Sequence, residues 1–284
     1  MAAEIAPQVV LVNGAPAACI SALDRAVHYG DGLFETIACR GGRPRWLSWH
    51  LQRLTQGCTR LGLERPDLER LAAEVRELAL GSARSLVKVL LTRGTAVARG
   101  YSLTGTERAT RITVRYAWPE EDDRASHEGV RVRTGALRLG ENPALAGIKH
   151  LNRLEQVMAR REWTDPAVAE ALLYSRSGLL VSGTMSNVFM VQGSCLRTPR
   201  IDLCGVAGVM RRVVLREAMQ AGIPCEEREL QRCDLEAAEE LFLTNARIGI
   251  WPIAALDGRL LAPGPVTRRL QRLLAPRLEE PTDE

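Results

Sequence analysis

Hydrophobic positions along this chain repeat with two different periods, which predict a mixture of helices and strands. Two stretches, 49–61 and 67–80, carry apolar residues three or four positions apart, the spacing that lines one face of a helix. The stretches 9–14 and 33–39 carry short apolar runs next to turn residues, a pattern typical of strands. The Asn13-Gly14 pair that ends the first run predicts a tight turn.

The same two patterns continue to the C-terminus and predict a mixed α/β fold. No period of about 20 to 50 residues repeats, which argues against a solenoid. Further helices are predicted over 148–162, 208–221 and from Pro265 to about Leu274. Further strands are predicted over 85–93, 110–118, 129–137, 169–174, 179–192, 225–230 and 240–245.

A charged segment divides the predicted elements into two series. Residues 119–128 read PEEDDRASHE and contain no large apolar side chain, as a linker would. The length of 284 residues fits two domains of ordinary size. We therefore expect an N-terminal α/β domain over 1–118, a linker over 119–128, and a strand-rich C-terminal α/β domain over 129–284.

The amino-acid composition is typical of a globular enzyme. Hydrophobic residues make up 46% of the chain and charged residues 25%, and no run of about 18 apolar residues could span a membrane. The segment Met1–Val12 lacks the basic start of a signal peptide, so a cytoplasmic protein is expected. The net charge of +4 comes from basic residues interleaved with acidic ones, which argues against nucleic-acid binding.

Cysteine and histidine usage predicts neither disulfides nor a metal site. The seven cysteines form no CxxC pair, and the four histidines lack metal-ligand spacing. Lysine usage is more informative, since only Lys88 and Lys149 occur among 38 basic residues. Arginine stays protonated and cannot form a Schiff base, whereas a lysine amine can. Both lysines are therefore candidates for a role that arginine cannot take.

Three short segments combine glycine with residues that can carry chemistry. HYGDGLFET at 28–36 places two glycines around an acid, which any tight turn would also do. GIKHLNRLE at 147–155 places Lys149 in the first turn of a predicted helix, where an exposed lysine without function would look the same. GVAGVMRR at 205–212 is a glycine-spaced loop that runs into a helix, and helix starts bind phosphate.

Taken in order, six segments resemble the fold-type IV pyridoxal-phosphate (PLP) enzymes over nearly the whole chain. This group includes branched-chain and D-amino-acid aminotransferases and 4-amino-4-deoxychorismate lyase. Residues 93–102 and 140–157 resemble the lyase branch in particular. The resemblance implies a two-domain, mixed α/β fold like that of D-amino-acid aminotransferase. The six segments are YGDGLFET, HLQRL, GIKHLNRLEQ, SGTMSNVF, GVAGVMRR and LFLTNA.

The resemblance also implies roles for individual residues. Lys149 matches the lysine that forms a Schiff base with PLP and, at the start of its predicted helix, would act as the base once freed. Arg53 matches the arginine that holds the cofactor phosphate. The rest of the phosphate cup matches Gly208, Val209, Thr244 and Asn245.

The substrate of the lyase branch carries two carboxylates, and their charge indicates which residues would contact it. Arg93 and Arg99 are favoured as its partners, since arginine binds carboxylates well. Thr36 is the candidate acid that protonates the leaving group. Lys88 has two interpretations, a strand lysine whose amine reaches the rim of the sheet or a residue of the site, and it does not match the Schiff-base position.

One position departs from the family pattern. Alignment on residues 186–189 (SNVF) puts Ser182 where the family usually has a glutamate that pairs with the pyridine nitrogen. A hydroxyl cannot hold a proton on the ring as an anion does, so the cofactor should be a poorer electron sink. We expect this to favour an elimination with an aromatic product over a transamination.

The resemblance therefore implies conversion of the small molecule 4-amino-4-deoxychorismate to 4-aminobenzoate and pyruvate, a step towards folate. The alternative enzyme is a branched-chain or D-amino-acid aminotransferase, and a non-catalytic descendant that binds a ligand or partner is a third possibility. PLP is the expected cofactor, without a metal. A homodimer is the expected assembly.

Overall fold

The computed structural model describes residues 6–96, 99–119 and 124–280, and the chain divides into two compact units. Of the described residues, 6–96, 99–119, 148–152 and 277–280 form what we call the N-terminal unit. Residues 124–147 and 153–276 form the C-terminal unit. In contrast to the expected domain division, the short segment that carries Lys149 therefore groups with the N-terminal strands, because it hydrogen-bonds to one of them.

The N-terminal unit is built on a six-stranded antiparallel sheet with strand order β2-β1-β6-β5-β3-β4. Asn13 and Gly14 both have left-handed backbone angles (φ 54° and 86°), so the predicted tight turn between β1 and β2 is confirmed. The strands are β1 (Pro7–Val12), β2 (Ala15–Pro16), β3 (Gly32–Arg40), β4 (Arg43–Pro44), β5 (Arg84–Thr92) and β6 (Thr110–Ala117).

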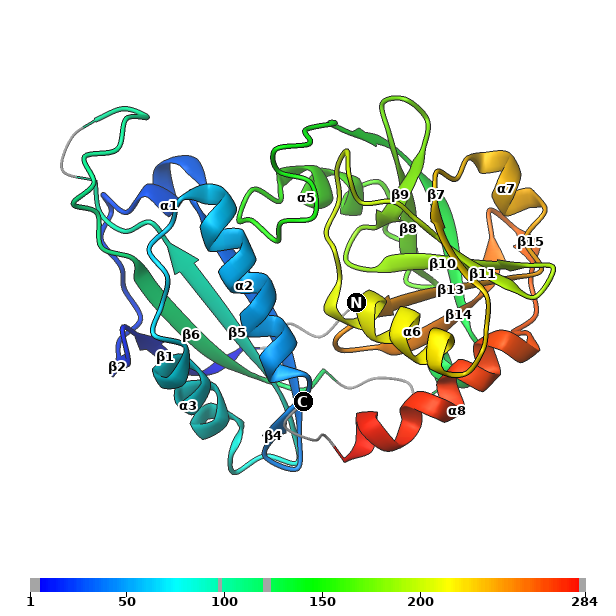
Figure 1. Cartoon of the computed structure of the whole chain (residues 1–284), viewed down its shortest axis with the longest axis horizontal. Coiled ribbons are helices and arrows are strands. Elements are labelled where there is room, and N and C mark those ends of the chain that lie inside the picture. Colours follow the sequence, from blue (N-terminus) through cyan, green and yellow to red (C-terminus); the bar gives the residue numbers. More distant parts are fainter. Residues whose placement is uncertain (1–5, 97–98, 120–123, 281–284) are drawn as a thin grey trace. The chain divides into compact units, whose positions relative to one another are not determined.

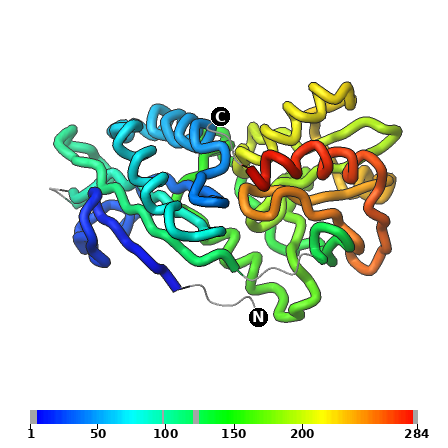
Figure 2. Tube along the Cα trace, turned by 90° about the horizontal axis from the view of Figure 1, so that it is seen from below, coloured from blue at the N-terminus to red at the C-terminus, as the bar shows by residue number. Residues whose placement is uncertain are grey.

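Two amphipathic helices cover one face of this sheet, as Figures 1 and 2 show. They are α2 (Leu47–Leu61) and α3 (Leu68–Ala79), close to the predicted spans, and the short α1 (Arg25–Tyr29) precedes β3. Their apolar faces and alternate residues of β3 and β5 form one buried core. The other residues of β3 and β5 lie on the opposite face of the sheet. This alternation decides on which face of the sheet each candidate site residue of β3 and β5 lies.

The C-terminal unit contains a nine-stranded mixed sheet, in which eight strands follow the order β12-β11-β10-β13-β14-β7-β8-β9 and the ninth, β15, pairs with β14. The sheet curls, because β9 at one end also packs against β10. Its strands are β7 (Val130–Leu139), β8 (Val168–Ser175), β9 (Leu180–Gly183), β10 (Asn187–Gln192), β11 (Cys195–Pro199), β12 (Cys225–Arg228), β13 (Glu240–Asn245), β14 (Gly249–Leu256) and β15 (Arg259–Leu260).

Helices of the C-terminal unit include α6 (Val209–Gln220), which packs against β12 and β13, and the long α8 (Pro265–Glu279). Both were predicted. The helix predicted over 148–162 is wrong for its first six residues, since α5 spans only Leu154–Arg160. The remaining short helices are α4 (Arg124–His127), in the predicted linker, and α7 (Arg232–Glu236).

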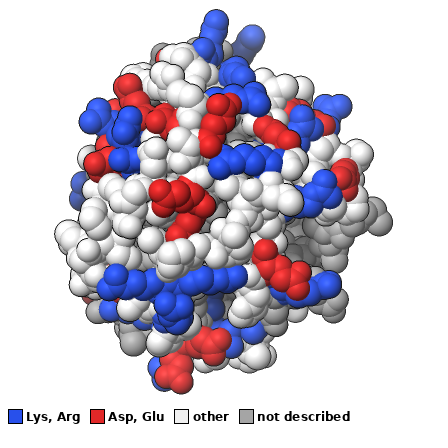
Figure 3. Space-filling model, turned by 90° about the vertical axis from the view of Figure 1, so that its right-hand side faces the viewer, with Lys and Arg blue, Asp and Glu red and all other residues white. Residues whose placement is uncertain are grey.

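The charge distribution agrees with the sequence pattern. On the face shown in Figure 3, acidic side chains lie between many of the arginine and lysine side chains, and some basic side chains adjoin one another in a band across the lower part of the view. In the part of the chain that the structure describes, no helix is both long enough and apolar enough to cross a membrane.

Candidate active site

Lys149 lies in an extended segment at the edge of the N-terminal sheet, and not in a helix. The backbone N–H of Phe34 donates to the Lys149 carbonyl (3.0 Å), and the N–H of Leu151 donates to the Gly32 carbonyl (2.9 Å). Gly147, with φ at 80°, turns the chain into this segment. Lys149 is therefore fixed by strand-like bonds to β3, and it lies before the first residue of α5, Leu154.

The side chain of Lys149 extends over an aromatic ring. Its Nζ atom lies 4.2 Å from the ring centroid of Phe34, and Nζ of Lys88 lies 5.3 Å from the same centroid. An ammonium group over a phenyl face is attracted by the ring quadrupole. The two lysines of the chain thus meet at one residue of β3.

A buried trio of charged and polar side chains lies on the helix-covered face of β3. Glu35 is 1% exposed and accepts hydrogen bonds from His50 Nδ1 (2.7 Å) and Arg53 Nε (2.8 Å), while Arg53 Nη2 donates to its second oxygen. Burial alone would raise the pKa of Glu35, but the charge of Arg53 and the hydrogen bonds from His50 and Arg53 lower it to about 2. The charged trio fixes Arg53, the predicted phosphate ligand.

His50 completes this trio as a neutral imidazole. Burial lowers its pKa below the usual value of 6.5. Because Glu35 is ionised, the Nδ1 atom of His50 carries the proton that it donates, which leaves Nε2 unprotonated. The described residues offer Nε2 no hydrogen-bond partner. His50 and Glu35 were missed at the sequence level, although Glu35 stands within an apolar strand.

Glu35 should make the stability of the fold depend on pH. Its folded pKa of about 2 lies below its ordinary 4.5, so the stabilisation is present above pH 4.5 and is lost as pH falls towards 2. A Glu35→Gln variant is expected to unfold with a free energy lower by about 3 kcal/mol at neutral pH. Urea unfolding from pH 7 to 3, with the exposed Glu77→Gln as control, should show this deficit shrinking in acid. A deficit that is constant with pH would contradict the assignment.

The glycine loop before α6 is the second predicted part of the site, in the C-terminal unit. Gly208 caps α6 without a side-chain hydrogen bond, so the first N–H groups of the helix are available to an anion. A Cβ atom at Gly208 would lie 2.0 Å from Asn187 Oδ1, and the amide of Asn187 donates to the Val206 carbonyl (2.9 Å). Only glycine fits at position 208, because the side chain of Asn187 occupies the space that a Cβ atom would need.

Thr244 and Asn245 end β13 in the same unit. The Thr244 hydroxyl is fully buried and donates to the Gly249 carbonyl (2.6 Å). The side-chain Oδ1 atom of Asn245 accepts from the backbone N–H groups of Arg247 (2.9 Å) and Ile248 (3.0 Å). Both side chains therefore shape the turn, and their contribution to a phosphate site stays a prediction.

Ser182 lies on β9 beside a buried acid that sequence reasoning missed. Ser182 is 8% exposed, and its hydroxyl donates to the Gly183 carbonyl (2.8 Å). Glu170 of β8 is 1% exposed and accepts bonds from Thr184 N (2.9 Å), Met185 N (3.1 Å) and Ser186 Oγ (2.9 Å). Glu170 thus uses both oxygens to hold the β9–β10 turn, and no alternation in the sequence marked it.

Arg93, a predicted substrate contact, is engaged within the protein. Its guanidinium donates to both Asp31 oxygens (2.8 and 3.1 Å) and to the carbonyls of Leu61 (2.8 Å) and Gly62 (2.7 Å). Asp31 also accepts from Arg25 (2.9 Å); burial would raise the pKa of Asp31, but the hydrogen bonds from both arginines lower it. This geometry gives Arg93 a local structural role, and its role towards substrate stays a prediction.

The two remaining candidates, Arg99 and Thr36, lie in different surroundings. Arg99 is exposed on the loop after β5. Thr36 is half-buried in the centre of β3, directly across from Lys88 on β5. Neither placement tests its predicted role.

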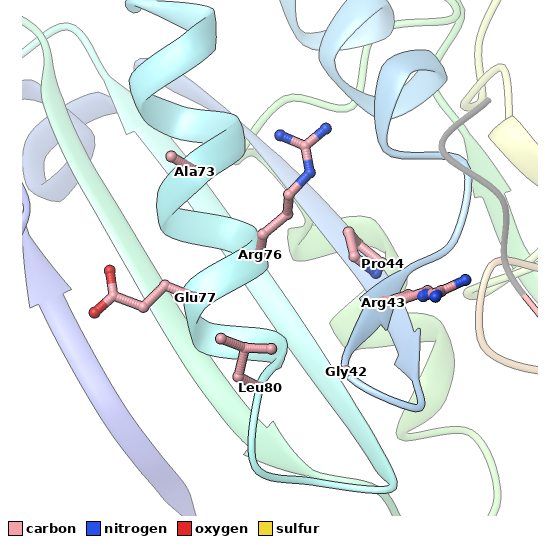
Figure 4. A pocket seen from close by; sticks show the side chains of 7 residues that line it. All are labelled: Gly42, Arg43, Pro44, Ala73, Arg76, Glu77 and Leu80. Atoms are coloured by element: carbon pink, nitrogen blue, oxygen red, sulfur yellow. The ribbon is translucent and has the colours of Figure 1, made fainter.

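A groove of about 580 Å³ on the N-terminal unit contains none of the candidate residues. It lies between α3 and the β3–β4 hairpin, and Figure 4 shows its charged side chains pointing away from one another. We assign it no chemistry. Its lining residues are Gly42, Arg43, Pro44, Ala73, Arg76, Glu77 and Leu80.

Comparison with known proteins places the chain in a family. The model of the class IV amino-transferase family matches residues 32–256, and the chain belongs to that family. It is 32% identical to the aminodeoxychorismate lyase of Vibrio harveyi, over 92% of this chain and 97% of that protein. A putative branched-chain-amino-acid aminotransferase of Methanocaldococcus jannaschii is 29% identical, over 89% of this chain and 88% of that protein.

The fold is also that of a solved lyase. The crystal structure of 4-amino-4-deoxychorismate lyase from Pseudomonas aeruginosa superposes with a TM-score of 0.92 and 41% sequence identity, covering 96% of this chain and 100% of that chain. The prediction of a fold-type IV, mixed α/β enzyme is thereby confirmed.

Proposed function

We propose that this chain is a PLP-dependent lyase that converts 4-amino-4-deoxychorismate to 4-aminobenzoate and pyruvate. The observation that carries this proposal is the similarity to lyases along the full chain, at 32% and 41% identity. The placement of Lys149 supports it, because a lysine fixed by strand bonds and set over a phenyl ring is a well-oriented amine. The predicted small-molecule substrate and step towards folate follow from the same similarity.

The donor set fits PLP. Lys149 offers an amine that can bond covalently to an aldehyde, Arg53 offers a rigid guanidinium, and the start of α6 at Gly208 offers backbone N–H groups for a dianionic phosphate. We propose that Val209, Thr244 and Asn245 add to the phosphate contacts. When bound, PLP withdraws electrons from the carbon that carries the substrate amine and so acidifies its hydrogen.

We propose that the protein's own residues act as base and acid in the proton transfers of the reaction. The Lys149 amine, once free, would act as the base that removes that hydrogen. Loss of the enolpyruvyl group leaves an aromatic ring. Thr36, on the same sheet face as Phe34, is proposed to serve the leaving group, and Arg93 and Arg99 the carboxylates.

Aminotransfer remains the second candidate, since a putative aminotransferase is 29% identical. Ser182 is the observation that separates the two. We propose that transamination needs an acid beside the ring nitrogen more than an elimination does, because formation of an aromatic product supplies driving force to the elimination. The buried acid nearby, Glu170, is committed to the β9–β10 turn.

We further propose that the enzyme is a homodimer in the cytoplasm. Leu154, Val157 and Met158 on α5 are 71%, 54% and 46% exposed, an apolar surface of the kind that subunits bury. All seven cysteines are free thiols, as a reducing compartment would keep them. Light scattering on the purified protein tests the assembly.

Supplying aminodeoxychorismate to the purified, PLP-loaded protein tests the function. We expect 4-aminobenzoate and pyruvate to appear in equal amounts, detected by fluorescence and by a coupled dehydrogenase. An amino acid offered with a 2-oxo acid should react far more slowly. If amino-group exchange is the faster reaction, the aminotransferase alternative holds.

A further inference from the structure

One buried side chain of α1 holds the loop 99–103, which lies between β5 and β6. Arg25 is 5% exposed, and its guanidinium donates from Nη1 to the Gly100 carbonyl (3.0 Å) and from Nη2 to the Tyr101 carbonyl (3.4 Å). Gly100 lies 75 positions further along the chain, so this contact is a product of the fold. Of the described residues outside the loop, only Arg25 forms a hydrogen bond to it.

The guanidinium of Arg25 needs these carbonyls as acceptors. Its Nε donates to Asp31 (2.9 Å), but Asp31 also accepts from Arg93, so one carboxylate serves two buried guanidinium groups. The ring centroid of Tyr29 lies 4.9 Å from the guanidinium carbon of Arg25. A guanidinium carries five N–H donors in a fixed fork, and burying them without acceptors costs free energy. Burial of Arg25 therefore favours the position in which the loop lies against it.

The backbone of the loop is shaped for this contact. Successive carbonyls of an extended chain point in opposite directions, so two of them reach one guanidinium only where the chain turns. Gly100 makes this turn with a φ of 117°, a backbone angle that favours glycine. The ring of Tyr101 lies 5.3 Å from that of Tyr29, which adds a second contact between the loop and α1. The loop thus meets α1 at a defined place next to Arg99.

We propose that Arg25 is a positioning residue for substrate binding, because it holds the loop that presents Arg99, an inference that rests on the proposed lyase function. The side chain of Arg99 is exposed, and Arg99 directly precedes Gly100. A loop that is ordered before the substrate arrives lowers the entropy cost of binding a carboxylate. Arg25 acts through the loop, since its own guanidinium is buried and bonded to Asp31 and two carbonyls.

Tryptic cleavage after Arg99, identified by mass spectrometry, reads the position of the loop without turnover. Arg25→Met removes the donors to the loop, and cleavage should become about 10- to 100-fold faster, the value of one or two lost charge-assisted hydrogen bonds. Arg25→Lys keeps the charge but not the fork, so it should also release the loop, and it serves if Arg25→Met does not fold. Glu107→Gln is the matched control, because it loosens the turn in which Thr104 N donates to Glu107 (2.8 Å) and leaves the bonds of Arg25 intact. Cleavage after Arg99 in Glu107→Gln should remain as in the wild type.

Steady-state formation of 4-aminobenzoate reads the consequence for the substrate. In Arg25→Met we expect KM to rise about tenfold with little change in kcat, the pattern of a lost binding interaction. Binding of PLP, followed by absorbance, should stay the same, because Lys149 and Arg53 lie on other elements.

Equal cleavage in the wild type and both Arg25 variants would overturn the proposal, and so would a released loop with an unchanged KM. A wild type that forms no 4-aminobenzoate would refute the lyase function and with it the role towards substrate. The cleavage rates would then still decide whether Arg25 holds the loop, so the two failures are distinguishable.

Discussion

Replacing Lys149 by alanine is expected to lower lyase activity by at least about 10³-fold, the scale of a lost positioned base and covalent anchor. The amine of Lys149 is held over Phe34, at 4.2 Å, by an edge segment that is itself bonded to β3. No other described residue can replace both functions, because Lys88 is anchored on a different strand. Formation of 4-aminobenzoate measures the loss.

Covalent attachment provides a measurement independent of turnover. Borohydride should fix PLP to the wild type, and mass spectrometry of the digest should find it on the peptide that contains Lys149. Lys149→Arg keeps the charge but cannot bond to an aldehyde, so it should be as inactive as Lys149→Ala. A Lys149→Arg variant with substantial activity, or a label on Lys88, would refute the assignment.

Periodicity was sufficient for most of the fold. The helices α2, α3 and α6 and the strands β3, β5 and β13 occur within two or three residues of their predicted ends. Strand β14 was missed because Pro252 stands in its middle, which normally argues against a central strand. Strand β11 was also missed.

The helix predicted around Lys149 was wrong for a long-range reason. Ile148, Leu151 and Leu154 are three residues apart, which resembles a helix face. The backbone N–H of Leu151, however, bonds to Gly32, which is remote in sequence. Local spacing contains no information about such a partner, so the segment around Lys149 was predicted as a helix although it is extended.

The charged parts of the site were the least predictable. The bond between Arg93 and Asp31 joins residues 62 positions apart, one just after β5 and one just before β3. The trio around Glu35 joins β3 to α2. A sequence shows that such groups exist but not which of them neutralise one another. That pairing decides which cations remain for a ligand, and it shows that Arg93 already donates to Asp31 and to two backbone carbonyls.

A Ser182→Glu variant is expected to raise amino-group exchange at least about tenfold, the effect of one unit in the pKa of a group that it protonates. Ser182 is 8% exposed and its hydroxyl donates to Gly183, so it carries no charge that could hold a proton on a ring nitrogen. A glutamate there supplies that charge. Exchange between alanine and a 2-oxo acid, followed by coupled assay, measures the gain.

Ser182→Gln is the matched control, because it has the length of glutamate without the charge and should not raise exchange. A buried carboxylate at position 182 lacks a partner until the cofactor binds, so Ser182→Glu should melt lower than Ser182→Gln without PLP and regain stability with it. Lyase activity should change little in both variants, since formation of the aromatic ring drives that reaction. If Ser182→Glu raised elimination and exchange equally, the serine could not be what separates a lyase from an aminotransferase.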